Sequence, residues 1–270
     1  MAIAALLVAA IGPGCSQGSG SGTACGTLDI ASCWTGSFNL QPDFFAAVTA
    51  QDTDSLQLRV QNGGDYEVFS DGIAFLIDSI SAIRPGRLGQ TLSVSLPPGV
   101  TPPGVPLTAD PNPSLVHASL YLQKSCRTQN VALYAMDAVT LSATGSCGAA
   151  SAGASVNACP LLAQISATSS DASSDASATP DASLLPDGGV VGAPGAVVGS
   201  TIVFDSLFDG NTNEGNAGNR LTDVPQFDLY FADPREIAPG GLGPPPPCRA
   251  HLVGNFKFYF ERGQPEQPFQ

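Results

Sequence analysis

The strongest structural signal in the chain is the segment from Leu252 to Glu261. Three phenylalanines, Phe256, Phe258 and Phe260, occupy every second position there, with more polar residues between them. Residues two apart share one face of a β-strand, so the three rings line a single face. Such a face must be covered, because each phenylalanine contributes about 1.5–3 kcal/mol when it is buried. The segment therefore predicts a strand packed against a second sheet.

The same two-residue period recurs elsewhere in the chain. Leu56, Leu58 and Val60 alternate with polar residues, and the Asn-Gly-Gly-Asp sequence at 62–65 predicts a hairpin turn before a returning strand at 66–69. Further strands are expected at 73–77, 92–96, 118–123, 131–136, 138–144, 201–208 and 227–231. Only Asp43–Ala50 indicates helical turns, one or two of them, and the Pro-rich 99–113 stretch indicates a long loop.

About nine to eleven short strands separated by turn signals predict an all-β fold, either an antiparallel β-sandwich or a partly closed barrel. The stretch 151–200 differs in composition. It contains SSDASSDASATPDAS, and no Lys or Arg occurs from Thr128 to Asn219. Such a segment buries too little apolar surface to offset its chain entropy. We expect a disordered insertion at 151–200 in a single β domain spanning 25–270, rather than a linker between two domains.

The first fifteen residues indicate export. The apolar run Met1–Ile11 is shorter than the ~20 residues that span a bilayer, but it suits a signal peptide. Gly12 and Gly14 then precede Cys15. This stretch resembles a bacterial lipoprotein signal, which implies a signal peptide at 1–14, lipid on Cys15 and a flexible Gly/Ser tether at 15–24. The alternative is a buried apolar helix with an ordinary Cys15.

The seven cysteines fit this interpretation. A lipidated Cys15 leaves six for three disulfides. These candidates are Cys25, Cys33, Cys126, Cys147, Cys159 and Cys248. Plausible pairs are Cys126 with Cys147 and Cys25 with Cys33, although the sequence does not determine the connectivity. A metal site finds little support, since there is no Cys-x-x-Cys motif and the chain has only two histidines.

The C-terminal region carries a second resemblance. The Asp233-Pro234-Arg235 turn and the ending RGxPxQPF are similar to those of uncharacterised lipoproteins of social, gliding soil bacteria. The matched residues of the ending are Arg262, Gly263, Pro265, Gln267, Pro268 and Phe269. The resemblance implies a lipoprotein of the cell envelope and brings no activity with it. Ser16 after Cys15 is not the Asp associated with inner-membrane retention, which favours the outer membrane.

No catalytic motif is present. The chain lacks G-x-S-x-G, Walker, G-x-G-x-x-G and H-E-x-x-H sequences, and His117 and His251 are interpreted as packed or surface residues. The balance of 23 acidic against 10 basic residues, a net charge of -13, argues against nucleic-acid binding. No pair among the many carboxylates stands out as a glycoside-hydrolase pair.

The sequence also indicates, less strongly, a calcium site and a glycan-binding surface. Asp209, Asn211, Asn213 and Glu214 place oxygen ligands much as the front half of a calcium loop does, although Glu214 replaces the glycine of such loops. An Asn/Gly-rich hairpin loop explains the same residues, and no other cofactor is indicated. Separately, three aromatic residues offer a surface for stacking on a glycan, namely Trp34, Tyr66 and Tyr121.

Together these observations predict a lipid-anchored exported envelope protein with a structural, adhesive or ligand-binding role and no catalytic activity. Its expected partners are the membrane, through the N-terminal lipid, and a glycan or an envelope protein. The alternative is a secreted or anchored hydrolase that acts on polysaccharide.

Overall fold

The computed structural model describes residues 16–31, 33–49, 54–63, 70–97, 100, 114–127, 131–136, 139–140, 197–211, 214–236 and 246–261. Strands dominate this part of the chain, and its helices are single turns. The elements are β1 (Ser16–Ile30), β2 (Trp34–Leu40), β3 (Phe44–Thr49), β4 (Leu56–Asn62), β5 (Asp71–Ile77), α1 (Ile80–Ile83), β6 (Thr91–Ser95), β7 (Val116–Leu122), β8 (Ala132–Ala135), β9 (Val139–Thr140), β10 (Val197–Val198), β11 (Ser200–Val203), η2 (Ala217–Arg220), β12 (Leu221–Ala232), η3 (Pro234–Glu236) and β13 (Ala250–Phe260).

Eleven strands form one hydrogen-bonded sheet whose path closes on itself. The order is β11-β6-β7-β5-β4-β3-β1-β13-β12, and β12 pairs again with β11. β2 pairs with β1, while β8 joins β7 to β12. The pairings are antiparallel except that of β6 with β7, and β9 and β10 form a separate two-stranded sheet. The predicted all-β antiparallel class is confirmed.

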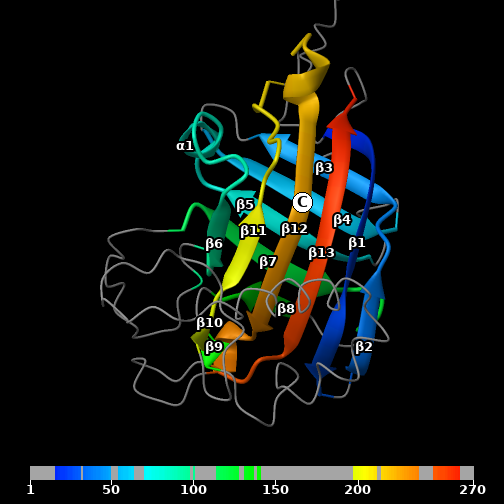
Figure 1. The fold of residues 1–270 in the computed structure, drawn as a ribbon. Coiled ribbons are helices and arrows are strands. Elements are labelled where there is room, and N and C mark those ends of the chain that lie inside the picture. The colour runs from blue at the N-terminus through cyan, green and yellow to red at the C-terminus, as the bar shows by residue number, and fades with distance from the viewer. Residues whose placement is uncertain are drawn as a thin grey trace, which may run out of the picture.

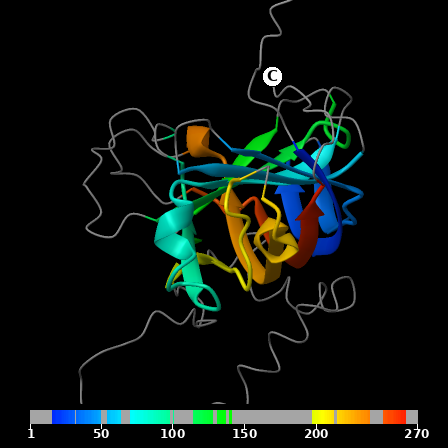
Figure 2. The ribbon, with the colours of Figure 1, turned by 90° about the horizontal axis from the view of Figure 1, so that it is seen from above.

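Two layers of this sheet face each other. β1, β12 and β13 run along the length of the molecule in front of β3, β4, β5 and β7, which cross behind them (Figure 1). Seen from above, the two layers are stacked (Figure 2). Phe45 stacks on Phe258 across the core, with ring centroids 5.5 Å apart, and Phe75 lies 5.3 Å from Phe256. Phe256, Phe258 and Phe260 are buried, which confirms the predicted inward face of β13.

The prediction of a flexible tether at 15–24 is wrong for Ser16–Ala24, because these residues form the first half of β1. Gly18, Gly20 and Gly22 lie opposite the three core phenylalanines of β13. A Cβ atom on Gly20 would lie 2.5 Å from the carbonyl oxygen of Lys257 and would collide with the side chain of Phe258. The strand therefore requires glycine at these positions, because the neighbouring strand and its rings leave no space for a side chain.

The prediction of helical turns at Asp43–Ala50 is also wrong, because Phe44–Thr49 is strand β3. Phe45 and Ala47 belong to the main core, whereas Phe44 and Ala46 form a second small cluster with Val48. Since apolar residues occupy both faces, the polar–apolar alternation that reveals a half-exposed strand is missing.

Most other predicted strands have described counterparts in β4, β5, β6, β7, β8, β11 and β12. β5 pairs on both sides, with β4 and β7, as expected for a central strand. The leader 1–15, the returning strand 66–69, nearly all of the Pro-rich loop, residues 151–196 of the insertion and the 262–270 ending lie outside the described residues. None of the described helices is long and apolar enough to cross a lipid bilayer.

Candidate functional site

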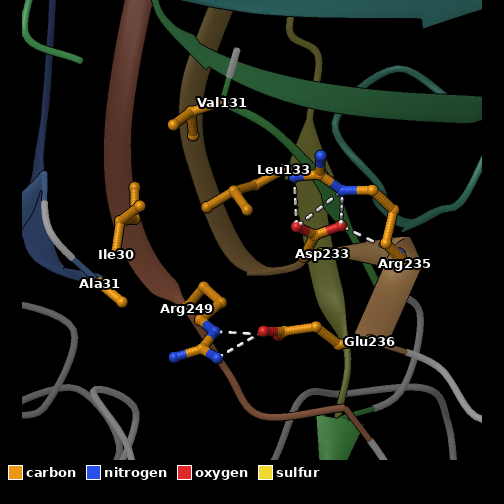
Figure 3. A pocket seen from close by; sticks show the side chains of 8 residues that line it. All are labelled: Ile30, Ala31, Val131, Leu133, Asp233, Arg235, Glu236 and Arg249. Atoms are coloured by element: carbon orange, nitrogen blue, oxygen red, sulfur yellow. Dashed lines mark hydrogen bonds and ion pairs between the residues drawn. The ribbon is translucent and has the colours of Figure 1, made fainter. Parts of the chain in front are cut away.

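A pocket of about 420 Å³ lies at the end of the sandwich where β1 finishes (Figure 3). One side of it is apolar: Ile30 comes from the end of β1, Leu133 from β8, and Val131 from the residue before β8. All three side chains are buried. The remaining lining residues are Ala31, Asp233, Arg235, Glu236 and Arg249. The pocket thus combines an apolar wall with a charged one.

Two arginine–carboxylate pairs form the charged wall. Nε and Nη2 of Arg235 donate to the carboxylate of Asp233 at 2.9 and 2.6 Å. Nε and Nη2 of Arg249 donate to Glu236 at 2.9 and 2.5 Å. Two parallel N–H···O bonds fix the orientation of both partners as well as their distance. The charged wall therefore presents donors and acceptors in set positions, with equal numbers of positive and negative groups.

The Asp-Pro-Arg turn creates the first of these pairs. Proline fixes the backbone φ of position 234, which suits a tight turn directly after β12. The Asp233 carboxylate accepts the backbone N–H of Arg235 at 2.9 Å and then its side chain as well. The local sequence thus brings both charges to the pocket. The Asp-Pro-Arg turn was noticed for its similarity to other lipoproteins, and that similarity did not indicate that the turn lines a pocket.

Long-range backbone contacts position Arg249. Its N–H donates to the carbonyl of Phe231 at 2.8 Å, and its own carbonyl accepts the N–H of Asp29 at 2.7 Å. The chain before β13 is therefore held between the ends of β12 and β1. This arrangement brings Arg249 to Glu236, on the far side of the loop that joins β12 to β13.

The hydrogen bond from Arg235 lowers the pKa of the Asp233 carboxyl below its ordinary value. A group whose folded pKa lies below its unfolded value of about 3.9 stabilises the fold above that pH, and the contribution is lost as the pH falls through the folded pKa. We expect Asp233 to titrate below the ordinary value of about 3.9, and Arg235→Gln to move its titration back toward that value. Carboxyl NMR titration measures this. Asp54, whose pKa is lowered by hydrogen bonds from Ser79 and Ser81, is the internal control, and equal movement of both residues would contradict the assignment.

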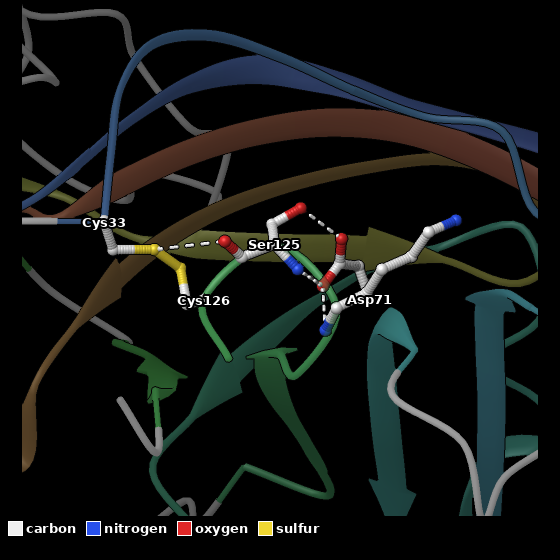
Figure 4. Close-up of a disulfide and its surroundings, with 5 residues drawn as sticks. Cys33, Asp71, Ser125 and Cys126 are labelled. Atoms are coloured by element: carbon white, nitrogen blue, oxygen red, sulfur yellow. Dashed lines mark hydrogen bonds between the residues drawn. A yellow bond between two sulfur atoms is a disulfide. The ribbon is translucent and has the colours of Figure 1, made fainter. Parts of the chain in front are cut away.

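A disulfide joins the two segments that carry the apolar wall. Cys33 is bonded to Cys126, with their Cα atoms 5.4 Å apart (Figure 4). Cys33 follows Ile30 in the chain, and Cys126 precedes Val131. The suggested pairs Cys25–Cys33 and Cys126–Cys147 are therefore wrong. Cys25 and Cys248 are disulfide-bonded as well, while Cys15, Cys147 and Cys159 lie outside the described residues.

The turn that carries Cys126 is held by a buried carboxylate. Asp71, at the start of β5, accepts the backbone N–H groups of Lys124 and Ser125, both at 3.0 Å, and the Ser125 hydroxyl at 2.5 Å (Figure 4). Three such bonds satisfy a carboxylate that is only 6% exposed. Cys126 therefore lies in a turn that hydrogen bonds to Asp71 hold against the start of β5.

The proposed calcium ligands do not converge on a cation. Arg84 places its Nη1 atom 3.5 Å from the carboxylate of Asp209, which also accepts the N–H of Asn211 at 2.8 Å. Glu214 instead accepts the N–H of Asn216 at 2.6 Å. Asn213 lies outside the described residues, within which no three His, Cys, Asp or Glu side chains gather around a metal position. The described residues support the alternative, a polar loop.

Two of the three aromatic residues suggested for glycan stacking, Trp34 and Tyr121, are packed into the fold instead. Trp34 is half-buried, meets Phe38 edge-on and donates from Nε1 to the carbonyl of Ser37 at 3.2 Å. The ring of Tyr121 is covered by the guanidinium of Arg59, 5.1 Å from its centroid. Tyr66 lies outside the described residues. The two described rings therefore offer no exposed stacking platform.

His117 lies between a serine and an aspartate, as in a hydrolase triad, but the contacts differ from one. Its Nδ1 atom is 3.1 Å from the carbonyl oxygen of Ser95 and 3.4 Å from the Ser95 hydroxyl, while Nε2 is 3.1 Å from Asp78. A backbone carbonyl only accepts, so Nδ1 faces Ser95 as a hydrogen-bond donor. Nδ1 therefore offers no lone pair to take a proton from the Ser95 hydroxyl, and the contacts of His117 tie β6, β7 and the end of β5 together.

His251 also has a packed environment. Its Nε2 atom lies 2.7 Å from the carboxylate of Asp228, and its ring stacks on Tyr230 with centroids 4.3 Å apart. Burial raises the pKa of the Tyr230 phenol. The phenol therefore stays neutral beside the hydrogen bond between His251 and Asp228, and the two rings form a cross-strand contact between β12 and β13.

Sequence reasoning did not identify Arg249 and Glu236 as site residues. They are distant in the chain, and their pairing depends on the loop between β12 and β13. One signal was available: among only 10 basic residues, Arg235 and Arg249 flank this one proline-rich loop. The chain matches no protein-family model, and neither a curated protein nor a solved structure shows significant similarity to it.

Proposed function

We propose that the protein is an exported, lipid-anchored component of the cell envelope that binds a small ligand in the pocket between β1, β8, β12 and β13. The state of the cysteines supports export. Cys33 is bonded to Cys126, and Cys25 and Cys248 are also disulfide-bonded. Disulfides persist in oxidising compartments such as the bacterial periplasm and the cell surface.

The pocket itself is the observation that carries the binding role. Its volume of about 420 Å³ lies in the range of small-molecule sites. Such sites combine apolar walls with a few fixed polar groups, and here Ile30, Val131 and Leu133 face two bidentate ion pairs. Both the turn after β12 and the disulfide near β8 hold these groups in place. A preformed site of this kind costs little ordering on binding.

The same geometry favours binding over polysaccharide hydrolysis. A glycosidase needs one carboxylic acid that is still protonated at the working pH, which requires a raised pKa. In the pocket, Arg235 lowers the pKa of Asp233, and Glu236 accepts two hydrogen bonds from Arg249. Asp233 is therefore held in the ionised form, and both oxygens of Glu236 are occupied by Arg249, an arrangement that suits recognition and not general-acid catalysis.

The position of the pocket fits an anchored binding protein. β1 begins at Ser16, so a lipid on Cys15 would hold that end of the sandwich at the membrane without a spacer. Ile30, at the other end of this 15-residue strand, lines the pocket. The strand spans about 45 Å at ~3.3 Å per residue. The pocket would therefore lie at the end of β1 that is farther from the bilayer.

Metabolic labelling with palmitate tests the anchor. We expect label on the wild-type chain and on the control Ser16→Ala, and none on Cys15→Ala. Cys15→Ala should also leave the membrane fraction when the cells are broken. Palmitate that persists on Cys15→Ala would exclude Cys15 as the lipidated residue, whatever the outcome of the binding experiments.

A fragment screen followed by blocking of the pocket tests the binding role. Ala31 lies at the exposed rim, so Ala31→Trp fills the opening without altering the buried wall. We expect true ligands to bind the Ala31→Trp protein at least about tenfold more weakly, a difference of about 1.4 kcal/mol. Asn39→Trp, at an exposed position of β2, is the matched control and should bind normally. Hits that bind both variants equally would disprove the pocket as the binding site.

A further inference from the structure

The two ion pairs of the pocket also restrict the chemical class of its ligand. Each guanidinium uses Nε and Nη2 for its carboxylate. Within the described part of the chain, no hydrogen bond reaches Nη1 of Arg235 or Nη1 of Arg249. Both oxygens of Glu236 accept one hydrogen bond each and keep further acceptor capacity. The Glu236–Arg249 ion pair therefore still offers a hydrogen-bond donor, Nη1 of Arg249, next to acceptors, the carboxylate oxygens of Glu236.

A hydroxyl group matches this arrangement because it donates one hydrogen bond and accepts others. It can donate to an oxygen of Glu236 while it accepts from Nη1 of Arg249. A ligand carboxylate would accept from Arg249 but would face Glu236 and Asp233 as like charges. A ligand ammonium would meet Arg235 and Arg249 in the same way. The charges of the lining thus disfavour both ionic classes.

The apolar wall adds a second requirement. Ile30, Val131 and Leu133 form an aliphatic surface opposite the ion pairs, and none of the described residues that line the pocket is aromatic. A ligand must therefore present a C–H surface on one side and hydroxyl groups on the other. A sugar ring has this distribution, with axial C–H groups on its faces and hydroxyls around its edge.

From these observations we infer that the pocket binds a neutral, polyhydroxylated ligand of the size of one or two sugar rings. This inference rests on the proposed binding function and specifies its ligand class. Glu236 and Arg249 supply the paired acceptor and donor for a ring hydroxyl, and Leu133 and Val131 contact the C–H face. The site differs from the stacking platform expected from Trp34 and Tyr121, because it uses aliphatic contacts and charge-paired side chains.

Titration with sugars that differ in charge tests the inference. The probes are glucose and N-acetylglucosamine as neutral sugars, glucuronate as the anion and glucosamine as the cation. Methyl NMR of Ile30, Val131 and Leu133 reports binding. We expect the neutral sugars to bind the wild-type protein at least tenfold more tightly than either charged analogue, about 1.4 kcal/mol.

Two variants separate charge selection from general damage. Glu236→Gln keeps the shape of the side chain but leaves Arg249 unneutralised, so glucuronate should gain affinity relative to glucose. Lys257→Gln breaks an ion pair with Asp223, which lies away from the pocket, and should leave the selectivity unchanged. Tighter binding of glucuronate or glucosamine than of the neutral sugars by the wild-type protein would overturn the inference.

The sugar titration and the Ala31→Trp variant together separate the selectivity for neutral sugars from ligand binding in the pocket. Should charged fragments bind and be blocked by Ala31→Trp while neutral sugars do not bind, the neutral-ligand inference fails and the pocket remains a binding site. Should Ala31→Trp block no compound of any class, both fail together.

Discussion

Replacing both Gly20 and Gly22 with alanine is expected to lower the free energy of unfolding by about 3 kcal/mol, as overpacking does in a filled core. A Cβ atom on Gly22 would lie 2.7 Å from the Asn255 carbonyl oxygen and 2.8 Å from Cβ of Phe256. In a flexible tether the same substitutions would be neutral, or would stabilise the protein by about 0.4–1 kcal/mol through the unfolded chain. The sign of the effect therefore distinguishes a packed strand from a linker.

Urea denaturation followed by the fluorescence of Trp34, the only tryptophan, measures this effect. The matched control is Ser19→Ala with Ser21→Ala, because both serines lie in the same stretch of β1 and are exposed. This control should change stability by less than about 0.5 kcal/mol. Equal urea midpoints for the glycine and serine double variants would show that the segment is not packed against β13.

The tether prediction failed because composition and pattern pointed in different directions. Glycine and serine together are typical of linkers, yet Gly18, Gly20 and Gly22 alternate strictly with more polar neighbours. This is the same period that identified β13. Only the register, which places these glycines opposite Phe256, Phe258 and Phe260, explains why side chains are missing on that face. Register is a long-range property that one strand does not reveal.

The clearest alternation signals came from strands with one more accessible face. β13 alternates buried Phe256 and Phe258 with exposed Lys257, and β4 alternates buried Leu56 and Leu58 with a half-buried Gln57. β3 was misread because Phe44 and Phe45 are both buried, so its residues show no period. The alternation signal therefore depends on solvent at one face, and it disappears where both faces are covered.

The candidate site was less predictable than the fold, for a related reason. Asp233 and Arg235 are neighbours in a turn and were noticed as a motif, whereas Glu236 and Arg249 meet only through tertiary structure. Sequence spacing identified a calcium-like loop at Asp209, but a distant arginine neutralises that carboxylate. A local sequence pattern shows which side chains are able to bind a ligand. The tertiary structure determines which of those side chains already interact with other residues of the protein.

Serine at both Cys33 and Cys126 is expected to lower the free energy of unfolding by about 4 kcal/mol, because the bond closes a long loop in the unfolded chain. The two cysteines are 93 residues apart in sequence. Among the described residues, Cys25 and Cys248 are also disulfide-bonded, and they remain in this variant and keep part of the chain constrained. Urea denaturation of the oxidised proteins measures the difference, and a loss below about 1 kcal/mol would contradict a structural role for this bond.

A second variant separates a local role of the Cys33–Cys126 bond, that of positioning the apolar wall, from its effect on the unfolded chain. Asp71→Ala keeps the disulfide but removes the acceptor for Lys124, Ser125 and the Ser125 hydroxyl, at an expected cost of about 1–3 kcal/mol. If the disulfide positions the apolar wall, the double serine variant should shift the methyl NMR signals of Ile30 and Val131 under fully native conditions. If it acts only on the unfolded chain, those signals should stay in place while the stability falls. A wall that moves in the Asp71→Ala protein as well would show that the turn, and not the covalent bond alone, sets the shape of the pocket.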